Sequence, residues 1–337
     1  MEERLGVVLF THVPDLAFAE MAEVARRAEE LGYERVYTNE ALTDTLSIDM
    51  LIACHTRRVV VGSFVAIIYY RHPFVAALAA TAISEVSGGR FILGLGVSHP
   101  PRNRGLGLAP GRPLEDMRRY VAQVKGVLAG ETVYPELPLQ TYQGRRVQFR
   151  QPTHPVPVYI AAVGPAMAEL GGEIADGLML NMVPLSRMDE IREAVARGAR
   201  RAGRDPATVE LDLGLNVFLS EDVARARQRA RLAMAYFVGM PAYNRALRAA
   251  GFEEEARVLR DAFLRGDQEA LLANITDEII EEFCAVGPAE RCRERIAAFR
   301  AAGADFVALM VNPVEPEETY RGALERCLPL LAPAEPR

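Results

Sequence analysis

The chain has 337 residues, half of them hydrophobic, and a formal net charge of −6. This length suits one large α/β domain over residues 1–337, and the acidic balance argues against nucleic-acid binding. There is no secretory leader and no long uncharged apolar run, so we expect a cytoplasmic protein without membrane contact. The four cysteines form no Cys-x-x-Cys pair, which favours reduced thiols.

One unit recurs along the chain: an amphipathic helix, a glycine and a short apolar strand. In the first copy Gly32 supplies a left-handed residue before a strand at 35–38. The predicted apolar face of its helix consists of Phe18, Met21, Ala22, Ala25 and Ala28. Gly303 precedes a similar strand at 306–311, and Gly171-Gly172 occupy the same place in a looser copy. Such repetition predicts stacked βα units.

The segment 59–101 contains two continuous apolar runs, Val59–Ile68 and Phe91–Val97, on either side of an Ala-rich segment that suits a helix. Continuous rather than alternating runs are typical of parallel strands buried on both faces. Gly94 and Gly96 interrupt the second run, and we expect them to let a flat or anionic ligand approach the backbone. A site beyond the carboxyl ends of parallel strands is therefore expected.

Eight strands are predicted, and together they favour a closed (β/α)8 barrel over an open sheet. They begin near Arg4, Arg35, Arg58, Phe91, Pro157, Gly177, Val209 and Phe306. Two stretches exceed the minimal unit. Residues 132–154 are predicted to be an inserted hairpin or loop, and residues 237–276 a helical insertion; neither resembles a separate domain.

Several kinds of chemistry find no support in the sequence. The five histidines show neither His-x-His nor His-Glu-x-x-His spacing, so no metal site is predicted. Lys125 is the only lysine and lies in a helical pattern, which argues against a Schiff base at a strand end. There is also no Gly-x-Ser-x-Gly elbow and no Walker A motif.

A phosphate-binding turn is predicted where the strand 158–162 runs into Val163-Gly164-Pro165 and a helix. Pro165 suits the first helical position, and Gly164 leaves backbone amides uncovered. Such a helix N-terminus can bind an anion. The alternative is an ordinary βα turn.

Other side chains that follow strands leave two interpretations open. Tyr69 and Tyr70 either wall a planar ligand, with Arg71 binding an acidic group, or pack the rim while Arg71 pairs with a carboxylate. His72, before a proline, suits a helix N-terminus. His99 could transfer a proton, because the ordinary pKa of histidine lies near neutral pH. The alternative is that His99 is only a partly exposed loop residue. Glu40 is either structural or catalytic.

Six segments resemble the bacterial-luciferase-like superfamily of flavin-dependent oxidoreductases. They are ELGYERVYTNEAL, VVVGSFVAIIYYRHPFVAALAAT, SGGRFILGLGVSHPP, RPLEDMRRYV, PVYIAAVGPAMAELGGEIADGLMLN and GADFVALMV, and the similarity covers nearly the whole chain. The resemblance implies a (β/α)8 barrel with insertions, commonly a homodimer, that binds FMN or the deazaflavin coenzyme F420 at its carboxyl mouth. The RHP, GLGVSH and RPxxxMRxYV patterns are more similar to the F420 branch.

The resemblance also implies roles for individual residues. It assigns the cofactor phosphate to Ala162, Val163 and Gly164, and it places the third strand behind the deazaflavin ring with a cis peptide between Phe64 and Val65. Together with the rim positions, the expected cofactor-binding set is Asn39, Phe64, Val65, Ala66, Gly96, Val97, Ser98, Ala161, Ala162, Val163, Gly164 and Asn181. His99 and Glu40 are the expected catalytic residues, facing one cavity, with Glu40 orienting His99 or raising its pKa.

The expected function is hydride transfer between F420 and a small organic substrate. Members of the branch that oxidise sugar phosphates have Asp-His where this chain has Asn39-Glu40, and a Glu where it has His99, so the substrate stays open. The alternatives are an FMN-dependent monooxygenase, a phosphate-binding isomerase or lyase without redox chemistry, and a non-catalytic cofactor carrier.

Overall fold

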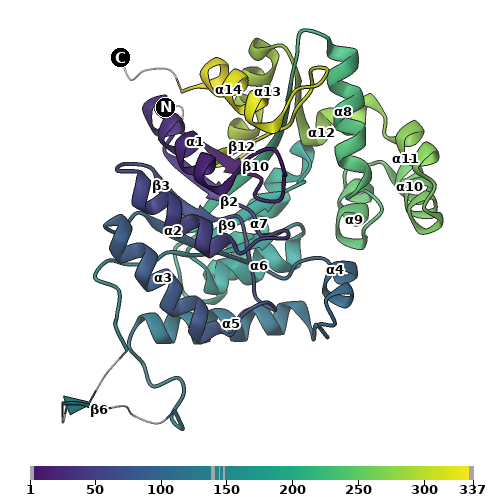
Figure 1. The fold of residues 1–337 in the computed structure, drawn as a ribbon. Coiled ribbons are helices and arrows are strands. Elements are labelled where there is room, and N and C mark those ends of the chain that lie inside the picture. Colours follow the sequence, from purple (N-terminus) through teal and green to yellow (C-terminus); the bar gives the residue numbers. More distant parts are fainter. Residues whose placement is uncertain (1–3, 138–140, 144, 147–148, 334–337) are drawn as a thin grey trace.

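The computed structural model describes residues 4–137, 141–143, 145–146 and 149–333, with helices around the outside of the molecule (Figure 1). In that part of the chain, eight parallel strands pair in sequence around a ring. They are β1 (Leu5–Leu9), β2 (Arg35–Thr38), β3 (Val60–Ser63), β5 (Phe91–Gly96), β8 (Val158–Ala162), β9 (Gly177–Asn181), β10 (Glu210–Leu219) and β12 (Phe306–Val311). Because β12 pairs with β1, the ring is closed, which confirms the predicted (β/α)8 barrel.

Each of these strands begins within two residues of its predicted position. The residues of β1, β5 and β12 are buried along their whole length. Helices cover the outer face of such strands and side chains fill the barrel inside, which is why the apolar runs are continuous.

Helices connect the strands and cover the barrel. They are α1 (Phe18–Glu30), α2 (Thr45–His55), α3 (Pro73–Ser87), α4 (Pro100–Gly105), α5 (Pro113–Leu128), α6 (Pro165–Ile174), α7 (Met188–Arg201), α8 (Val223–Ala235), α13 (Ala289–Ala301) and α14 (Tyr320–Leu331). The predicted face of α1 is buried except for Phe18, which begins the helix and is 50% exposed. Gly32 has the expected left-handed conformation, with φ of 87°.

Gly171 and Gly172 do not end a helix as predicted, because α6 continues to Ile174. Their role is close packing. A Cβ on Gly172 would lie 2.1 Å from the carbonyl oxygen of Val195, and a Cβ on Gly198 would lie 1.8 Å from the carbonyl oxygen of Glu169. Gly172 and Gly198 therefore let the backbones of α6 and α7 approach each other more closely than any side chain would allow.

Both predicted insertions contain secondary structure. Within 132–154, β6 (Thr141–Tyr142) and β7 (Arg145–Arg146) form an antiparallel hairpin that projects from the barrel (Figure 1), while residues 138–140, 144 and 147–148 lie outside the described residues. Within 237–276 lie three helices, which pack with α8 and α12 (Asp277–Phe283) around a separate apolar cluster. These are α9 (Pro241–Ala249), α10 (Glu253–Arg265) and α11 (Gln268–Asn274).

Two short strands were not predicted. After β3 the chain bends and resumes as β4 (Ala66–Ile67), which pairs with β5. β11 (Cys284–Gly287) pairs with the last four residues of β10, beyond the ring itself. β11 has only four small or apolar residues and begins directly after α12. The sequence therefore carries no signal that would separate this strand from the end of the helix.

The amino end of the barrel is filled by a buried polar cluster, which we call the barrel-floor cluster: Arg35, Tyr37, Tyr159, Glu210 and Asp212. Arg35 donates to both carboxylate oxygens of Glu210 at 2.8 Å and to Asp212 Oδ2 at 3.0 Å. The Arg35 guanidinium carbon also lies 4.0 Å from the centre of the Phe306 ring. The barrel is thus closed at this end. Within the described ranges, no helix has the length and apolar character needed to span a membrane.

Candidate functional site

A cavity of about 1260 Å³ opens at the carboxyl ends of the barrel strands. Its wall is formed by residues that follow the strands of the ring and, on one side, by the segment from the end of α8 into α9. Of the predicted site residues, those that line it are Asn39, Glu40, Phe64, Val65, Gly96, Val97, Ser98, His99, Ala161, Ala162, Val163, Gly164 and Asn181. Ala66 does not line the cavity, because it lies in β4 and is fully buried.

The N-terminus of α6 faces this cavity. Gly164 is the N-cap and Pro165 the first helical residue, as predicted, and no side chain caps the helix. A Cβ on Gly164 would meet nothing within 4 Å, so this position adjoins open space. The first amides of a helix have no partner within the helix and form a partial positive charge. This end of the cavity can therefore bind an anion.

The third strand shows the expected irregularity. The peptide between Phe64 and Val65 is cis, and both side chains line the cavity. The glycines of β5 serve this arrangement. A Cβ on Gly96 would lie 2.3 Å from Val65 Cγ2, and a Cβ on Gly94 would lie 2.1 Å from the carbonyl oxygen of Ser63. The space that a Cβ would fill at either glycine is thus taken by the protein's own third strand, while the approach of a ligand to Gly96, which lines the cavity, stays a prediction.

Several residues that line the cavity have a buried polar atom without a hydrogen-bond partner among the described residues, and two of these atoms belong to predicted site residues: Ser98 Oγ and Asn181 Oδ1. Ser98 also has a φ of 59°, a left-handed conformation that few residues with a side chain adopt. Buried polar atoms are nearly always hydrogen-bonded in folded proteins. Both atoms are thus available to a polar ligand.

Glu40 does not contact His99. Its side chain is 2% exposed and forms an ion pair with Arg71, which also pairs with Asp44. The Glu40 carboxylate further accepts hydrogen bonds from the backbone amides of Ile67 and Thr45. These contacts tie the loop after β2 to β4 and favour the structural interpretation of Glu40.

The same ion pair decides between the two interpretations of the segment after the third strand. Arg71 binds carboxylates of the protein itself and does not line the cavity. Tyr69 does line the cavity, and its hydroxyl donates a hydrogen bond to Asp116 Oδ2 at 2.9 Å. His72 is the N-cap of α3, where its ring accepts from the amide of Phe74, as its position before Pro73 predicts.

His99 lies against three aromatic rings of the α8–α9 segment. The ring centroids of Tyr236, Phe237 and Tyr243 are 6.2, 6.1 and 5.7 Å from that of His99. Burial, and secondarily the nearby Arg102 cation, lowers the pKa of His99 to about 4. His99 is therefore neutral at pH 7, and it suits a proton acceptor better than the proton donor expected from its ordinary pKa.

The prediction omitted several residues that line the cavity. The three aromatic side chains lie in or beside an insertion whose fold could not be predicted, and Arg102 lies in a six-residue helix, α4, beyond the strand end. His12 follows β1 directly and was recognisable only as a rim position. Its Nδ1 accepts a hydrogen bond from Asn39 Nδ2, at 3.4 Å.

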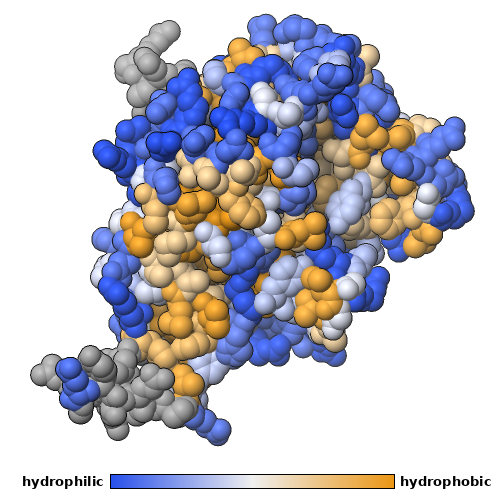
Figure 2. All heavy atoms as spheres, viewed as in Figure 1, coloured by the Kyte–Doolittle hydropathy of each residue, from blue (hydrophilic) through white to orange (hydrophobic). Residues whose placement is uncertain are grey.

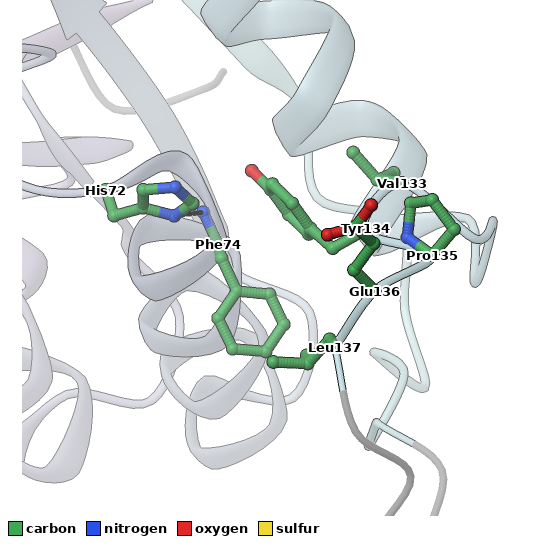
Figure 3. Close-up of a pocket in the computed structure, with 7 residues that line it drawn as sticks. All are labelled: His72, Phe74, Val133, Tyr134, Pro135, Glu136 and Leu137. Carbon is green, nitrogen blue, oxygen red and sulfur yellow. Dashed lines mark hydrogen bonds between the residues drawn. The ribbon is translucent and has the colours of Figure 1, made fainter.

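A second, smaller hollow of about 550 Å³ lies outside the barrel mouth, between the start of α3 and the segment 133–137 (Figure 3). Figure 3 shows the ring of Phe74 beside Leu137, with Tyr134 between Phe74 and the 133–137 backbone. The rings of His72 and Tyr134 are 5.2 Å apart, and those of Phe74 and Tyr134 are 5.8 Å apart. The hollow is largely apolar and contains none of the predicted site residues, so the barrel mouth is the candidate site.

Comparison with known proteins bears on the family. Residues 4–305 match the family described as luciferase-like monooxygenase. Over 292 residues the chain is 30% identical to 5,10-methylenetetrahydromethanopterin reductase of Methanolobus tindarius, covering 84% of this chain and 87% of the relative. The corresponding reductase of Archaeoglobus fulgidus is 27% identical over 314 residues, covering 91% and 93%.

A solved structure gives the same result for the fold. The coenzyme F420 dependent tetrahydromethanopterin reductase of Methanopyrus kandleri superposes with a TM-score of 0.78 at 21% identity, covering 98% of each chain. With the family match over most of the sequence, the resemblance inferred from its segments is confirmed, and the chain belongs to the luciferase-like monooxygenase family.

Proposed function

We propose that this protein is an oxidoreductase that transfers a hydride between coenzyme F420 and a small organic substrate. The observation that carries the proposal is the large cavity at the barrel mouth with the uncapped N-terminus of α6 in its wall. F420 presents a flat ring and an anionic tail, and the unpartnered atoms of Ser98 and Asn181 add polar groups for such a ligand. The coenzyme F420 dependent reductase of Methanopyrus kandleri and the two related reductases named above support the choice of F420 over FMN.

When bound, the deazaflavin supplies the hydride chemistry. The chain's own residues supply the rest. The amides at Gly164 and the start of α6 would bind the anionic group, and Phe64 and Val65 would form the surface behind the ring. His99, neutral at pH 7, accepts or returns the proton that accompanies hydride transfer at a carbon next to O–H or N–H. Glu40 holds the loop after β2 in place through Arg71.

The direct test is titration of the purified protein with F420 and FMN in parallel, followed by absorbance. F420 is expected to bind at least about tenfold more tightly than FMN, a preference of about 1.4 kcal/mol. Tight FMN binding without measurable F420 binding would favour the alternative, an FMN-dependent monooxygenase, which the family's description also supports. Oxygen consumption with reduced FMN would then identify that activity.

Gly164→Asp tests where the cofactor anion binds. The substitution places a negative charge at a helix N-terminus that otherwise favours an anion. F420 affinity is expected to fall at least about tenfold, or about 1.4 kcal/mol. Gly164→Ala is the matched control, because its added Cβ meets nothing within 4 Å. If both variants bind F420 as the wild type does, the anion lies elsewhere on the rim.

We also propose that the protein is a homodimer that associates through α2 and α3. Three large apolar side chains on α3 are exposed: Val75 (52%), Leu78 (36%) and Val86 (51%). Figure 2 shows hydrophobic atoms gathered over the region where Figure 1 places α2 and α3. Sedimentation at twice the chain mass of 37.1 kDa is expected for the wild type, and the monomer mass for Leu78→Glu. A monomeric wild type contradicts the proposal.

A cytoplasmic location completes the proposal. All four cysteines are free, and Cys54 is an exposed thiol. Exposed free thiols are typical of reducing compartments. Cell fractionation of the native host tests this directly, and recovery from an extracytoplasmic fraction would contradict it.

A further inference from the structure

Arg102 is a half-buried cation on the cavity wall that has no carboxylate partner among the described residues. The one hydrogen bond of its guanidinium in that part of the chain runs from Nη1 to the carbonyl oxygen of Ala41, at 3.2 Å. Of the other arginines near this mouth, Arg71 pairs with Glu40 and Arg187 with Glu190, while Arg245 lines the cavity but is exposed to solvent. A guanidinium in a concave site normally meets a carboxylate or phosphate, with which it forms charge-assisted hydrogen bonds.

His12 presents a hydrogen-bond donor to the same cavity, and its neighbours determine which ring nitrogen carries the proton. The amide of Thr11 donates to Asn39 Oδ1 at 2.9 Å, so the Nδ2 group of Asn39 is the end turned toward His12. That Nδ2 group is only a donor. His12 Nδ1, 3.4 Å from it, is therefore the acceptor, and the proton of the neutral ring is on Nε2.

Arg102 and His12 are close enough to influence each other. The Arg102 charge contributes to lowering the pKa of His12, after burial, and it does the same for His99. The three side chains thus form one region of the wall that contains donors and positive charge. The two carboxylates that also line the cavity are already paired, Glu40 with Arg71 and Glu190 with Arg187.

His12 lies across the mouth from the helix end assigned to the cofactor, and Arg102, whose helix α4 follows β5, reaches toward the His12 side. His12 follows β1 and Arg102 contacts the loop after β2, whereas Gly164 follows β8. In the ring of strands, β1 and β8 are separated by β2, β3 and β5 on one side and by β9, β10 and β12 on the other. An anionic group bound at Gly164 therefore leaves the His12 side of the cavity, where Arg102 contacts the loop after β2, without an anion.

We propose that Arg102 and the Nε2–H of His12 form an anion-binding subsite that receives a carboxylate or phosphate group of the substrate. The inference rests on the proposed function, because it names the class of substrate for that site. Asn39 is a positioning residue here: it keeps His12 in the tautomer that donates into the cavity.

The test uses acetate and inorganic phosphate as probes on the cofactor-free full chain, with the histidine Cε1–H resonances followed by NMR over pH. A bound anion favours the charged imidazolium, so each probe is expected to raise the pKa of His12. In Arg102→Gln the apparent affinity for either probe is expected to fall at least about tenfold, or about 1.4 kcal/mol. Without a probe, the pKa values of His12 and His99 should both rise in this variant, because the nearby cation is gone.

Two further variants control for charge and folding. Arg104→Gln removes an exposed arginine from the same helix that does not line the cavity, and it is expected to bind the probes as the wild type does. Arg102→Lys keeps the charge and is expected to retain probe binding between that of the wild type and that of Arg102→Gln. Equal probe binding in the wild type and Arg102→Gln, or none in the wild type, overturns the subsite.

Cofactor titration separates the substrate from the cofactor as the source of the anion. F420 affinity is expected to be unchanged in Arg102→Gln; a tenfold loss would assign the anion to the cofactor and overturn the substrate assignment. If the wild type binds no F420 but still binds the probes through Arg102, the proposed function fails while the subsite stands. Among accepted substrates, a carboxylic acid should have a lower KM than its methyl ester in the wild type, and Arg102→Gln should abolish that difference.

Discussion

Arg35→Ala is expected to lower the free energy of unfolding by about 3–5 kcal/mol, the usual effect of removing one partner of a buried ion pair. Arg35 is the cation of the barrel-floor cluster, and its side chain is 7% exposed. Its loss leaves Asp212, which is fully buried, without a counter-charge, and deprives Glu210 of two hydrogen bonds. Urea denaturation followed by circular dichroism measures the change.

Arg4→Ala is the matched control for this prediction. Arg4 also pairs with Glu210, at 3.2 Å, but its side chain is 39% exposed. Solvent screens such a pair, so the expected loss is about 1 kcal/mol or less. Equal losses in Arg4→Ala and Arg35→Ala would contradict the idea that burial makes the barrel-floor cluster important.

The same cluster predicts a direction for the pH dependence of stability. Burial raises the pKa of Asp212 to about 6 from an ordinary value of 3.8. Because the folded-state pKa is higher than the unfolded one, protonation of Asp212 stabilises the fold below about pH 4, and this contribution is lost as the pH rises through about 6. Asp212→Asn should remove that component of the stability profile between these pH values.

His99→Ala is expected to lower turnover by roughly 10²–10⁴-fold while leaving F420 affinity unchanged, if His99 transfers the proton. Its pKa of about 4 means that the neutral form is present throughout the range from pH 6 to 8. The wild-type kcat should therefore show no histidine titration in that range, and it should fall as the pH approaches 4. Steady-state kinetics with any accepted substrate, repeated over a range of pH, measure kcat for both the wild type and His99→Ala.

His55→Ala controls for the loss of a histidine in general. His55 is exposed at the end of α2 and does not line the cavity, so its replacement is expected to leave turnover unchanged. Near-wild-type turnover of His99→Ala would reduce His99 to a packing partner of Tyr236, Phe237 and Tyr243. A limb near pH 6.5 that disappears in His99→Ala would show instead that its pKa is close to ordinary.

Local sequence determined the barrel and part of the site. The eight strands were predictable because parallel strands buried on both faces require continuous apolar runs, and a glycine or polar residue ends each run. The start of α6 was predictable because Gly164-Pro165 expresses a local backbone preference that does not depend on distant residues. The irregular third strand came from the resemblance, and the structure has the implied cis peptide.

Tertiary structure alone decided which side chains share the cavity and which of them are already paired. Glu40 is 31 residues from Arg71 in the sequence, and the pair forms only because β2 and the third strand are neighbours in the ring. The glycines of β5 leave room for Val65 and Ser63 of the third strand, a contact that the sequence of one strand cannot reveal. His99 owes its low pKa to burial, to which rings more than a hundred residues away contribute, and Arg102 combines partial burial with the absence of a carboxylate partner among the described residues. Pairing, burial and charge depend on distances through space, and a sequence records only positions along the chain.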